Sequence, residues 1–557
     1  MTEKTSESKK CQNCRRDFTI EPDDFSFYEK MKVPAPTFCP DCRFQRRLLF
    51  RNNRVFYKRE CVLCKKSVIS IYHQERPYTV YCYDCWFSDK WDVMSYGRDY
   101  DFSTPFFKQF IELQKAVPRA SLYRENFISS DYCNYGRDFK ECYLLFGGAN
   151  NERVYFGNQI FDSRDSLDIA FSEKLEFSYE NFECSRTNKL FFSHHCQDCV
   201  ENSYLIDCRN CMNCFGCIGL VNKQYHIWNV SHTKEEYNNF LKEREGSYAK
   251  HLESLKKLHE LDLTLPHRYA RIYKSINSDG DDLSEARNTH YSYSSRQTED
   301  SKYLFFIRNN VKDCYNNTFQ GFNSELCYET AHSFGGNNTA FGVRNFDNRD
   351  AFYNEECHNC SDIFGCEGLR KKSYCILNKQ YSKEEYEELK EQIIQNMKNT
   401  DEWGLFFPKE LSPFCYNEAI VNEYMPLTKE EALAQGFRWK DNIPGTKGQG
   451  TIEYPKLPKI PEDYNDNLIK EVLTCESCEK NYKLINREIN FYKKNKLSLP
   501  SKCFNCRHAL RMGKRNVRDL WNGKCAKCKT EIRTSYKPED QLKYQIFCEK
   551  CYQQEIY

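Results

Sequence analysis

"CPDCRFQRRLLFRNNR", from Cys39 to Arg54, is the stretch that decides how this chain is built. Its cysteine pair leads into residues 43–59, which hold seven Lys/Arg and no acidic residue. Nearly the same construction, "CFNCRHALRMGKRNVR", returns from Cys503 to Arg518. A cysteine pair followed by a basic segment near both ends of one chain indicates an internal duplication.

The cysteines extend this duplication. Each end carries four CxxC pairs, and the sixteen residues are Cys11, Cys14, Cys39, Cys42, Cys61, Cys64, Cys82, Cys85, Cys475, Cys478, Cys503, Cys506, Cys525, Cys528, Cys548 and Cys551. The first six of each set are related by a constant offset of 464 residues, and the last pair is shifted by two more. We therefore expect the same two-site module at both ends.

CxxC pairs at this spacing are typical of zinc sites. Zn²⁺ favours four tetrahedral ligands, so two CxxC turns complete one site. Consecutive pairing leaves gaps of 17 and 19 residues in the second site of the two modules, within the usual ribbon range. A crossed pairing of Cys11/Cys14 with Cys61/Cys64 stays open. Four thiolates leave no free coordination position, so we expect about four zinc ions with structural roles.

The segment after Cys42 or Cys506 is predicted to be a helix with an arginine stripe, as in a treble-clef finger. The stripe comprises Arg43, Arg47, Arg51, Arg54, Arg507, Arg511, Arg515 and Arg518. Arginine suits phosphate well, and phosphate contacts give affinity without sequence specificity. We therefore predict that these arginines contact nucleic acid, RNA or DNA. The alternatives are a solvated face, or pairing with the middle of the chain. Outside the two basic segments, the chain has 69 Lys/Arg and 80 Asp/Glu, so the rest of the chain is acidic.

Aromatic residues recur about every twelve positions between the two modules. One series is Tyr143, Tyr155, Leu167, Tyr179, Phe191 and then Phe215. A second steps by 11 to 13 through Tyr303, Tyr315, Tyr328, Phe341, Phe352 and Phe364. This periodicity predicts two β-solenoid segments of short coils, about 120–230 and 290–381. We expect each to have a narrow core of stacked rings and thiols.

Both series lead into a polar helix. Thr233 and Ser382 are predicted N-caps, because each precedes a Glu-rich first turn. The helices, about 233–261 and 382–399, are expected to cap the open solenoid ends. Residues 401–440 are expected to pack on the second solenoid. Residues 441–463 are rich in Gly and Pro, which predicts an extended tether that lets the C-terminal module reposition.

One cysteine run invites a second interpretation. Cys208, Cys211, Cys214 and Cys217 form C-x2-C-x2-C-x2-C, which is close to an iron–sulfur pattern. The bacterial ferredoxin run has three residues before its last cysteine and then a proline, whereas Ile218 follows here. We favour buried packing of these thiols over a metal site. His194 and His195, beside Cys196, are expected to be packed or surface residues.

The fold is thus predicted to be multidomain and mainly β. Duplicated two-zinc treble-clef or zinc-ribbon modules flank two short-coil β-solenoids with capping helices. The predicted divisions are 1–95 (two-zinc module), 96–230 (first solenoid with lead-in), 231–289 (helical connector), 290–381 (second solenoid), 382–440 (helix and packing segment), 441–466 (linker) and 467–557 (two-zinc module).

Three quoted stretches resemble a known group of proteins. They are "FYEKMKVPAPTFCPDCRFQRRLLFRNNRVFYKREC" from Phe27, "YCYDCWFSDKWDVMSYGRDYDFSTPFFKQFIELQKAVPR" from Tyr81, and "NCFGCIGLVNKQYHI" from Asn213. They are similar to large zinc-ribbon, cysteine-rich repeat proteins of reduced-genome candidate-phyla bacteria. The resemblance covers most of the chain. It implies a bacterial cytoplasmic protein with zinc modules around cysteine-rich repeats, and it offers no catalytic residues to carry over.

Composition limits the functional classes. We interpret the 32 cysteines as metal ligands and as packing residues. We expect a reducing compartment, because "MTEKTSESKK" lacks the apolar region of a secretory signal. No run approaches the ~20 apolar residues of a membrane span. We therefore expect a cytoplasmic protein without membrane contact. No P-loop, GxSxG, HExxH or paired-acid motif is present, so we expect no catalytic residues. Nucleic-acid binding is the first hypothesis, and a protein-interaction scaffold built on the solenoids is the alternative.

Overall fold

The computed structural model describes residues 5–556, and the chain divides into two compact units. Unit 1 contains Met1–Leu122, Ala270–Ile443 and Arg518–Leu520. Unit 2 contains Tyr123–Tyr269, Pro444–Val517 and Trp521–Tyr557. Each unit therefore combines a terminal cysteine module with the solenoid that lies farther from it along the chain.

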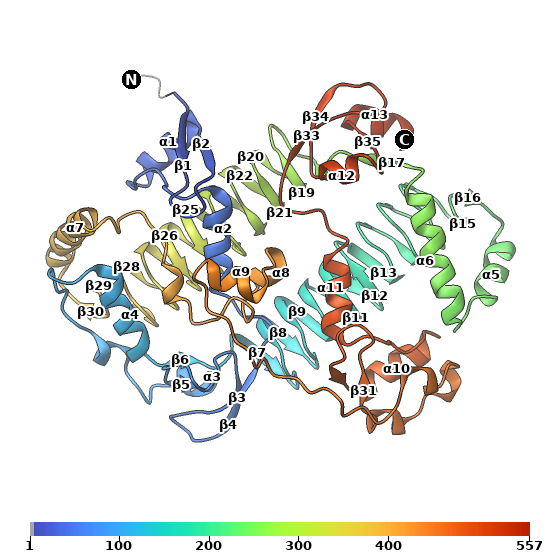
Figure 1. The fold of residues 1–557 in the computed structure, drawn as a ribbon, viewed down its shortest axis with the longest axis horizontal. Helices are drawn as coiled ribbons and strands as arrows, with labels where there is room; N and C mark the ends of the chain where they lie inside the picture. The colour runs from blue at the N-terminus through green and yellow to red at the C-terminus, as the bar shows by residue number, and fades with distance from the viewer. Residues whose placement is uncertain (1–4, 557) are drawn as a thin grey trace. The chain divides into compact units, whose positions relative to one another are not determined.

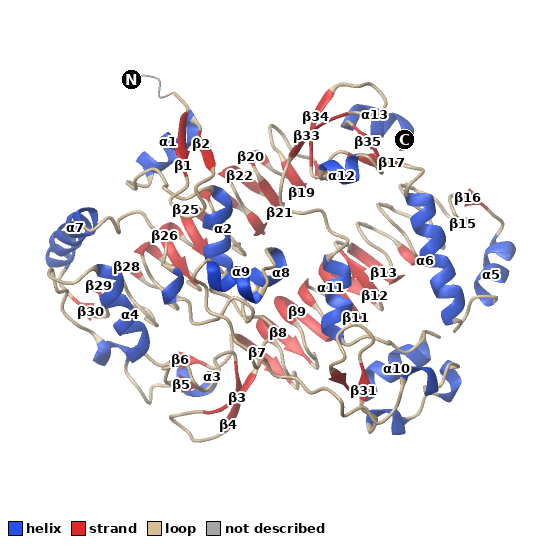
Figure 2. Ribbon diagram, in the orientation of Figure 1, coloured by secondary structure: helices blue, strands red, loops and turns tan. Residues whose placement is uncertain are grey.

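The first solenoid, in unit 2, is a stack of parallel strands (Figure 2). Within the described residues its main sheet runs through eight strands in the order β14 to β7. These are β7 (Arg124–Ile128), β8 (Asn134–Lys140), β9 (Phe146–Tyr155), β10 (Asn158–Phe161), β11 (Arg164–Glu176), β12 (Tyr179–Phe182), β13 (Ser185–Phe191) and β14 (Val200–Ser203). The register advances by one coil of twelve residues, as in the bridges from Tyr143 to Tyr155 and from Asn158 to Ala170. This confirms the predicted short-coil solenoid.

The coils turn at every third residue. Asp162, Asp165 and Asp168 all have φ between 50° and 53°, and this left-handed corner recurs along the solenoid. Asn and Asp tolerate this conformation better than most side chains. A third of the side chains consequently face the interior. They form a core in which Cys, Leu and Ile dominate, for example Cys196, Leu205 and Cys208.

The predicted core of stacked rings and thiols is only half right. The thiols lie inside the coils, but the aromatic rows lie on an outer face. Tyr179 is 5% exposed because the C-terminal module covers it, with its ring 5.5 Å from that of Tyr492. Inside the coils, Phe127 stacks on Phe139 at 4.7 Å, but Cys, Leu and Ile fill most of the interior, and the regular aromatic rows lie outside it. The rings instead supply the surface on which another element packs.

The second solenoid, in unit 1, follows the same plan with steps of 11 to 13 residues. Ile272 pairs with Leu283, and Val311 pairs with Ser324. Its strands are β18 (Ile272–Tyr273), β19 (Gly280–Ser284), β20 (Arg287–His290), β21 (Ser292–Arg296), β22 (Thr298–Lys302), β23 (Phe305–Ile307), β24 (Val311–Tyr315), β25 (Ser324–Ala331), β26 (Asn337–Val343), β27 (Arg349–Phe352), β28 (Ser361–Phe364) and β29 (Ser373–Ile376). It begins at β18, earlier than the expected residue 290, because the first coils lack the aromatic series.

Both solenoids end in a short antiparallel hairpin and a helix. The hairpins are formed by β15 (His226–Ile227) with β16 (Val230–Ser231), and by β29 with β30 (Lys379–Gln380). The following helices are α5 (Lys234–Lys242), α6 (Tyr248–Asp262) and α7 (Lys383–Asn399). Thr233 is the N-cap of α5 and Ser382 is the N-cap of α7, and they complete capping boxes with Glu236 and Glu385; the helix expected over 233–261 is divided in two, with Ser247 as the N-cap of α6. In the first solenoid, Tyr237 and Leu258 pack against Phe215 of the last coils.

Each cysteine module contains two hairpin-and-helix fingers. In the N-terminal module, β1 (Glu7–Lys10) pairs with β2 (Asp17–Ile20), and β3 (Tyr57–Glu60) pairs with β4 (Ser67–Ser70). In the C-terminal module, β31 (Leu473–Thr474) pairs with β32 (Asn481–Tyr482), and β33 (Trp521–Lys524) pairs with β34 (Glu531–Thr534). The finger helices are α2 (Pro40–Leu48), α3 (Tyr83–Trp86), α11 (Phe504–Met512) and α13 (Glu549–Ile556), and the long gaps hold α1 (Pro22–Lys30) and α10 (Asn486–Lys494).

The remaining segments pack on these cores. Between the N-terminal module and the first solenoid lies α4 (Phe106–Ala116), and residues 401–443 contain α8 (Val421–Tyr424) and α9 (Lys429–Ala434). Trp403 stacks on Phe364 of the second solenoid at 6.4 Å. No helix within residues 5–556 combines the length and the apolar character needed to cross a membrane.

The segment predicted to be an extended tether differs from that expectation. Tyr464 is 2% exposed and Leu457 is 5% exposed. The Tyr454 hydroxyl donates to the Leu499 carbonyl at 2.8 Å, and Ile452 bridges to Leu473. The apolar residues interspersed among the Gly and Pro residues anchor this segment to the C-terminal module.

Candidate metal centres and the basic helices

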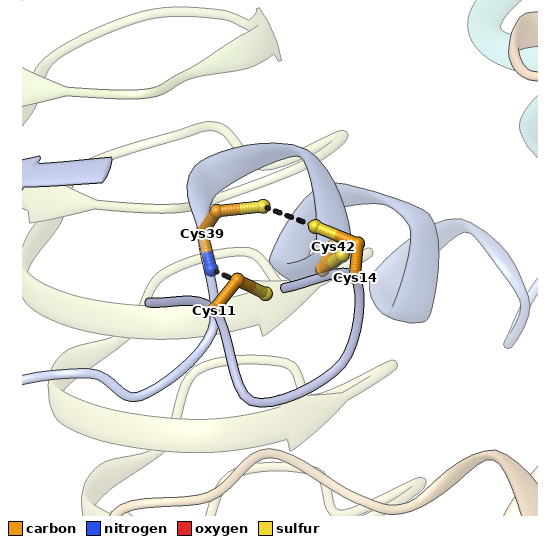
Figure 3. Close-up of side chains that lie close together, drawn as sticks. All are labelled: Cys11, Cys14, Cys39 and Cys42. Carbon is orange, nitrogen blue, oxygen red and sulfur yellow. Dashed lines mark hydrogen bonds between the residues drawn. The ribbon is translucent and has the colours of Figure 1, made fainter. Parts of the chain in front are cut away.

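Four groups of four cysteines could hold a metal ion within the described chain. Each group has its ligand atoms within 4.8 Å of one another. They are Cys11/Cys14/Cys39/Cys42, Cys61/Cys64/Cys82/Cys85, Cys475/Cys478/Cys503/Cys506 and Cys525/Cys528/Cys548/Cys551. Consecutive pairing of the CxxC turns is confirmed, and the crossed alternative is excluded. Figure 3 shows the first group, with its four sulfur atoms drawn together.

The spacing of the sulfurs fits one tetrahedral ion. The Sγ atoms are 3.7 Å apart in Cys14–Cys39 and in Cys478–Cys503, and 3.9 Å apart in Cys64–Cys82. Four sulfurs placed ~2.3 Å from one zinc ion in a tetrahedron would be separated by ~3.8 Å. The donor set is saturated by thiolates, so each group is suited to holding structure rather than to binding a substrate.

Backbone N–H groups favour the ionised form of these thiols. The Cys39 N–H donates to Cys11 Sγ at 3.2 Å, and the Cys503 N–H donates to Cys475 Sγ at 3.3 Å. Cys39 and Cys503 are themselves the N-caps of α2 and α11. Burial opposes ionisation of Cys475, but the hydrogen bond from the Cys503 backbone and others lower its pKa to about 6. Thiolate is the form that binds metal.

The run from Cys208 to Cys217 is not among the groups that could hold a metal ion in the described residues. All four thiols are at most 1% exposed and lie inside the coils. Cys208 Sγ donates to the Ile206 carbonyl at 3.4 Å, and Cys211 Sγ donates to the Arg209 carbonyl at 3.4 Å. Packing, not iron–sulfur ligation, is therefore the arrangement found. His195 Nδ1 lies 2.9 Å from Glu183, and His194 stacks on Phe182.

The basic helix of the C-terminal module packs one face, which carries Arg507 and Arg511, against the first solenoid (Figure 1). Arg507 Nε lies 3.0 Å from Asp168, and Arg511 reaches Asp168 at 3.0 Å and Glu180 at 2.9 Å. Arg515 pairs with Glu183 at 2.5 Å. Asp168 is completely buried, so it depends on these guanidinium groups for compensation.

The basic helix of the N-terminal module is held in the same way on the second solenoid, where α2 lies against β25. Arg47 is fully buried and lies 2.9 Å from Glu329. Arg51 contacts His332 and stacks 4.5 Å over the Phe319 ring. Arg54 pairs with Glu423 at 3.2 Å. Arg43 lies 5.4 Å over the Tyr303 ring.

The arginine stripe, which the sequence predicted to contact nucleic acid, lies mostly against side chains of the protein itself. Five of the eight arginines, Arg43, Arg47, Arg51, Arg507 and Arg511, are at most 6% exposed. The others, Arg54, Arg515 and Arg518, are half-buried. Arg518 lies 4.1 Å over the Phe44 ring. Pairing with acidic residues of the same chain, the alternative left open by the sequence, describes Arg47, Arg54, Arg507, Arg511 and Arg515.

The helices are also shorter than the stripe. Helix α2 ends at Leu48, so Arg51 and Arg54 belong to the loop that follows. Helix α11 ends at Met512 with Gly513 as its C-cap, so Arg515 and Arg518 lie beyond it. In the N-terminal loop, the Asn52 side chain accepts from the backbone N–H groups of Arg54 and Val55, which stabilises a turn instead of a further helical turn.

One buried carboxyl beside the basic helix has a shifted pKa. Burial raises the pKa of Glu488 to about 7, although Arg507 at 3.3 Å opposes this rise. Glu488 also accepts a hydrogen bond from the Tyr492 hydroxyl at 2.8 Å. Glu488 is therefore close to titration at neutral pH. Asp168, in contrast, accepts hydrogen bonds from Arg507 and Arg511.

A fifth group of possible metal ligands was not foreseen. His73, Cys415 and Glu418 lie within 4.8 Å of one another and are all buried. They come from segments that are distant in sequence, and no CxxC or HExxH spacing marks them. No pattern in the sequence alone could have brought them together.

Comparison with known proteins adds no function. No family model and no curated protein matches the chain. Among the solved structures, a protein from Desulfovibrio desulfuricans G20, provisionally named as an acetyltransferase, matches with 11% identity and a TM-score of 0.11. The match covers 51% of this chain and 73% of that one.

Proposed function

We propose that this protein is a non-enzymatic scaffold of the bacterial cytoplasm, in which zinc modules hold two solenoids that bind a protein partner. One observation carries the proposal: the basic helices are used inside their own units. An arginine that neutralises Asp168 or Glu329 is not available to a phosphate backbone. The modules then stiffen the solenoids instead of gripping a polymer.

Zinc is the metal we propose for the four cysteine groups. Four thiolates at tetrahedral spacing suit Zn²⁺, and such closed sites stabilise small folds. The free thiols also support a reducing compartment, because the structure has no disulfide among the described cysteines. A closed tetrathiolate site offers no position for substrate, which supports the non-enzymatic assignment of these centres.

The exposed side of the first solenoid is the proposed partner surface. Ion pairs join residues of adjacent coils, such as Arg153–Asp165 at 2.6 Å, Arg186–Asp198 at 2.6 Å and Lys189–Glu201 at 2.7 Å. We call these pairs the charged ladder. Each cation of the ladder pairs with an anion one coil away, so positive and negative charges alternate on this surface and it is not strongly positive. Such a surface favours a protein of complementary charge pattern over a nucleic acid.

The experiment uses the full chain purified from its own cells under native conditions, with crosslinking and mass spectrometry to locate partners. The ladder variant carries Arg186→Glu and Lys189→Glu, and a control carries Lys242→Glu and Lys256→Glu on the capping helices. We expect a protein partner crosslinked to the ladder, retained by the control and lost from the ladder variant. Nucleic-acid content is measured before and after a salt wash. Bound nucleic acid released by salt, with no partner that depends on the ladder, would overturn the proposal.

A further inference from the structure

The group formed by His73, Cys415 and Glu418 lies inside unit 1, apart from the four cysteine sites. His73 follows strand β4, and the other two residues precede helix α8. The three residues are 8%, 7% and 3% exposed. A sulfur, an imidazole nitrogen and a carboxylate oxygen are thus gathered within 4.8 Å in a buried position.

The carboxylate of Glu418 is oriented by two donors. The Tyr57 hydroxyl donates to Oε1 at 2.6 Å, and the Cys415 backbone N–H donates to Oε2 at 2.7 Å. Arg59 donates to the His73 carbonyl at 3.1 Å, which fixes the backbone that carries the imidazole. Outer contacts of this kind orient ligands around bound metals and fix their geometry.

One atom of the group lacks a hydrogen-bond partner. His73 Nδ1 is buried and accepts or donates no hydrogen bond within the described chain. The carboxylate of Glu75 is 3.6 Å away, beyond hydrogen-bond distance, and it is held by Lys440 at 2.7 Å. A buried polar atom without a partner is costly and calls for an unseen one.

We propose that His73, Cys415 and Glu418 form a fifth metal site, which takes a divalent cation of the zinc class. A mixed sulfur, nitrogen and oxygen donor set suits Zn²⁺. With three protein ligands instead of four, the ion keeps one position for water or for an external ligand. This sets the site apart from the closed cysteine centres, and it does not depend on the scaffold function.

The site also joins two segments that are far apart in the sequence. The second finger of the N-terminal module supplies His73, and the segment after the second solenoid supplies Cys415 and Glu418. A bound ion would crosslink the module to this segment within unit 1.

The test is a count of metal per chain by elemental mass spectrometry on zinc-loaded, gel-filtered full-length protein. The variants are Cys415→Ser, His73→Gln and Glu418→Gln. The control is Cys375→Ser, a fully buried thiol inside the second solenoid. We expect five zinc ions in the wild type and the control, and four in each of the three variants.

A second measurement does not depend on the folding of any variant. Wild-type protein loaded with ¹¹³Cd is examined by NMR, where a mixed-ligand site is resolved from four tetrathiolate sites. We expect a fifth resonance, and we expect this ion to leave first under a graded chelator. Four metals in the wild type with no fifth cadmium resonance, or five metals kept by all three variants, would overturn the fifth site. Either result leaves the four cysteine centres and the scaffold proposal to their own test.

Discussion

Asp168 explains the role of the arginines that follow the second cysteine pair. It lies at a corner of the first solenoid, fully buried, and accepts from both Arg507 and Arg511. Burying a charge is unfavourable, and paired burial is close to neutral only when every partner is present. The arrangement therefore adds little stability in total but makes the C-terminal module specific for this place on the solenoid.

We expect Asp168→Ala to destabilise unit 2 by about 3–5 kcal/mol, because two buried guanidinium groups lose their shared partner. The matched control is Asp198→Ala, which removes an exposed pair with Arg186 and should cost less than about 1 kcal/mol. Urea unfolding followed by tryptophan fluorescence measures both. Equal costs for the two variants would mean that the buried pairs do not hold the module.

Glu488 predicts a pH dependence with a definite sign. Its pKa is about 7 in the folded protein against an ordinary value of 4.5, so the folded state holds the proton more tightly. The stability it contributes is present below pH 4.5 and is lost as the pH rises through 7. Between pH 5 and 8 the wild type should lose up to about 3 kcal/mol relative to Glu488→Gln.

The measurement is urea unfolding of both proteins at several pH values, at fixed zinc concentration. Glu201→Gln on the charged ladder is the control, because Glu201 lies on the surface and pairs with Lys189. A difference between wild type and Glu488→Gln that is constant with pH would contradict the raised pKa.

The sequence predicted the four groups of cysteines well and the arginine partners poorly, for physical reasons. A thiolate site is local: two CxxC turns and their spacing nearly determine it. The partners of Arg511, in contrast, are Asp168 and Glu180, single acids at solenoid corners far away in the chain. Nothing near them in sequence distinguishes a buried corner acid from an exposed one such as Asp198.

At the scale of elements, the solenoid coil is a set of four short sides with a left-handed corner at every third residue. The twelve-residue period was visible in the sequence, because like residues stack in register. The sequence did not show which third of the residues faces inward, because the large aromatic rows dominate the pattern. Tyr155 and Tyr179 are large and regularly spaced, yet they face the C-terminal module, while Cys, Leu and Ile residues dominate the interior.

This packing predicts that the interior cysteines tolerate serine. Ser166 already donates from an interior position to the Arg164 carbonyl, as Cys208 does to Ile206. We expect a variant with Cys208, Cys211, Cys214 and Cys217 all changed to Ser to fold, to stay colourless and to keep the wild-type metal count. Cys525→Ser should lose one metal ion per chain. Elemental analysis decides, and any loss of metal from the fourfold variant would restore a ligand role for that run.

At the scale of the whole molecule, the order of segments is interleaved. The N-terminal module belongs with the second solenoid, and the C-terminal module belongs with the first. A cut between residues 269 and 270 would therefore leave each half with one module and one solenoid that belong to different units. The missing partner of each lies in the other half.

We expect fragments 1–269 and 270–557, produced together, to form a stable one-to-one complex. Each fragment alone should expose the aromatic rows and be digested rapidly by protease. Analytical ultracentrifugation measures the association, and Asp168→Ala in the first fragment should weaken it, whereas Asp198→Ala should not. Two fragments that are separately compact and do not associate would contradict the interleaved arrangement.

The interleaved order of segments also determines when each module can pack during synthesis. The N-terminal module is complete once Leu122 has been made, but the solenoid on which it packs begins at Ala270. At ~5–20 residues per second, the ribosome needs roughly 10–30 s to reach and extend into that solenoid. During this interval Arg43, Arg47 and Arg51 lack Tyr303, Glu329 and His332, the residues that they contact in unit 1. We therefore expect the growing chain, and not the finished protein, to be the form in which this basic face is uncovered, while the chain is still close to ribosomal RNA.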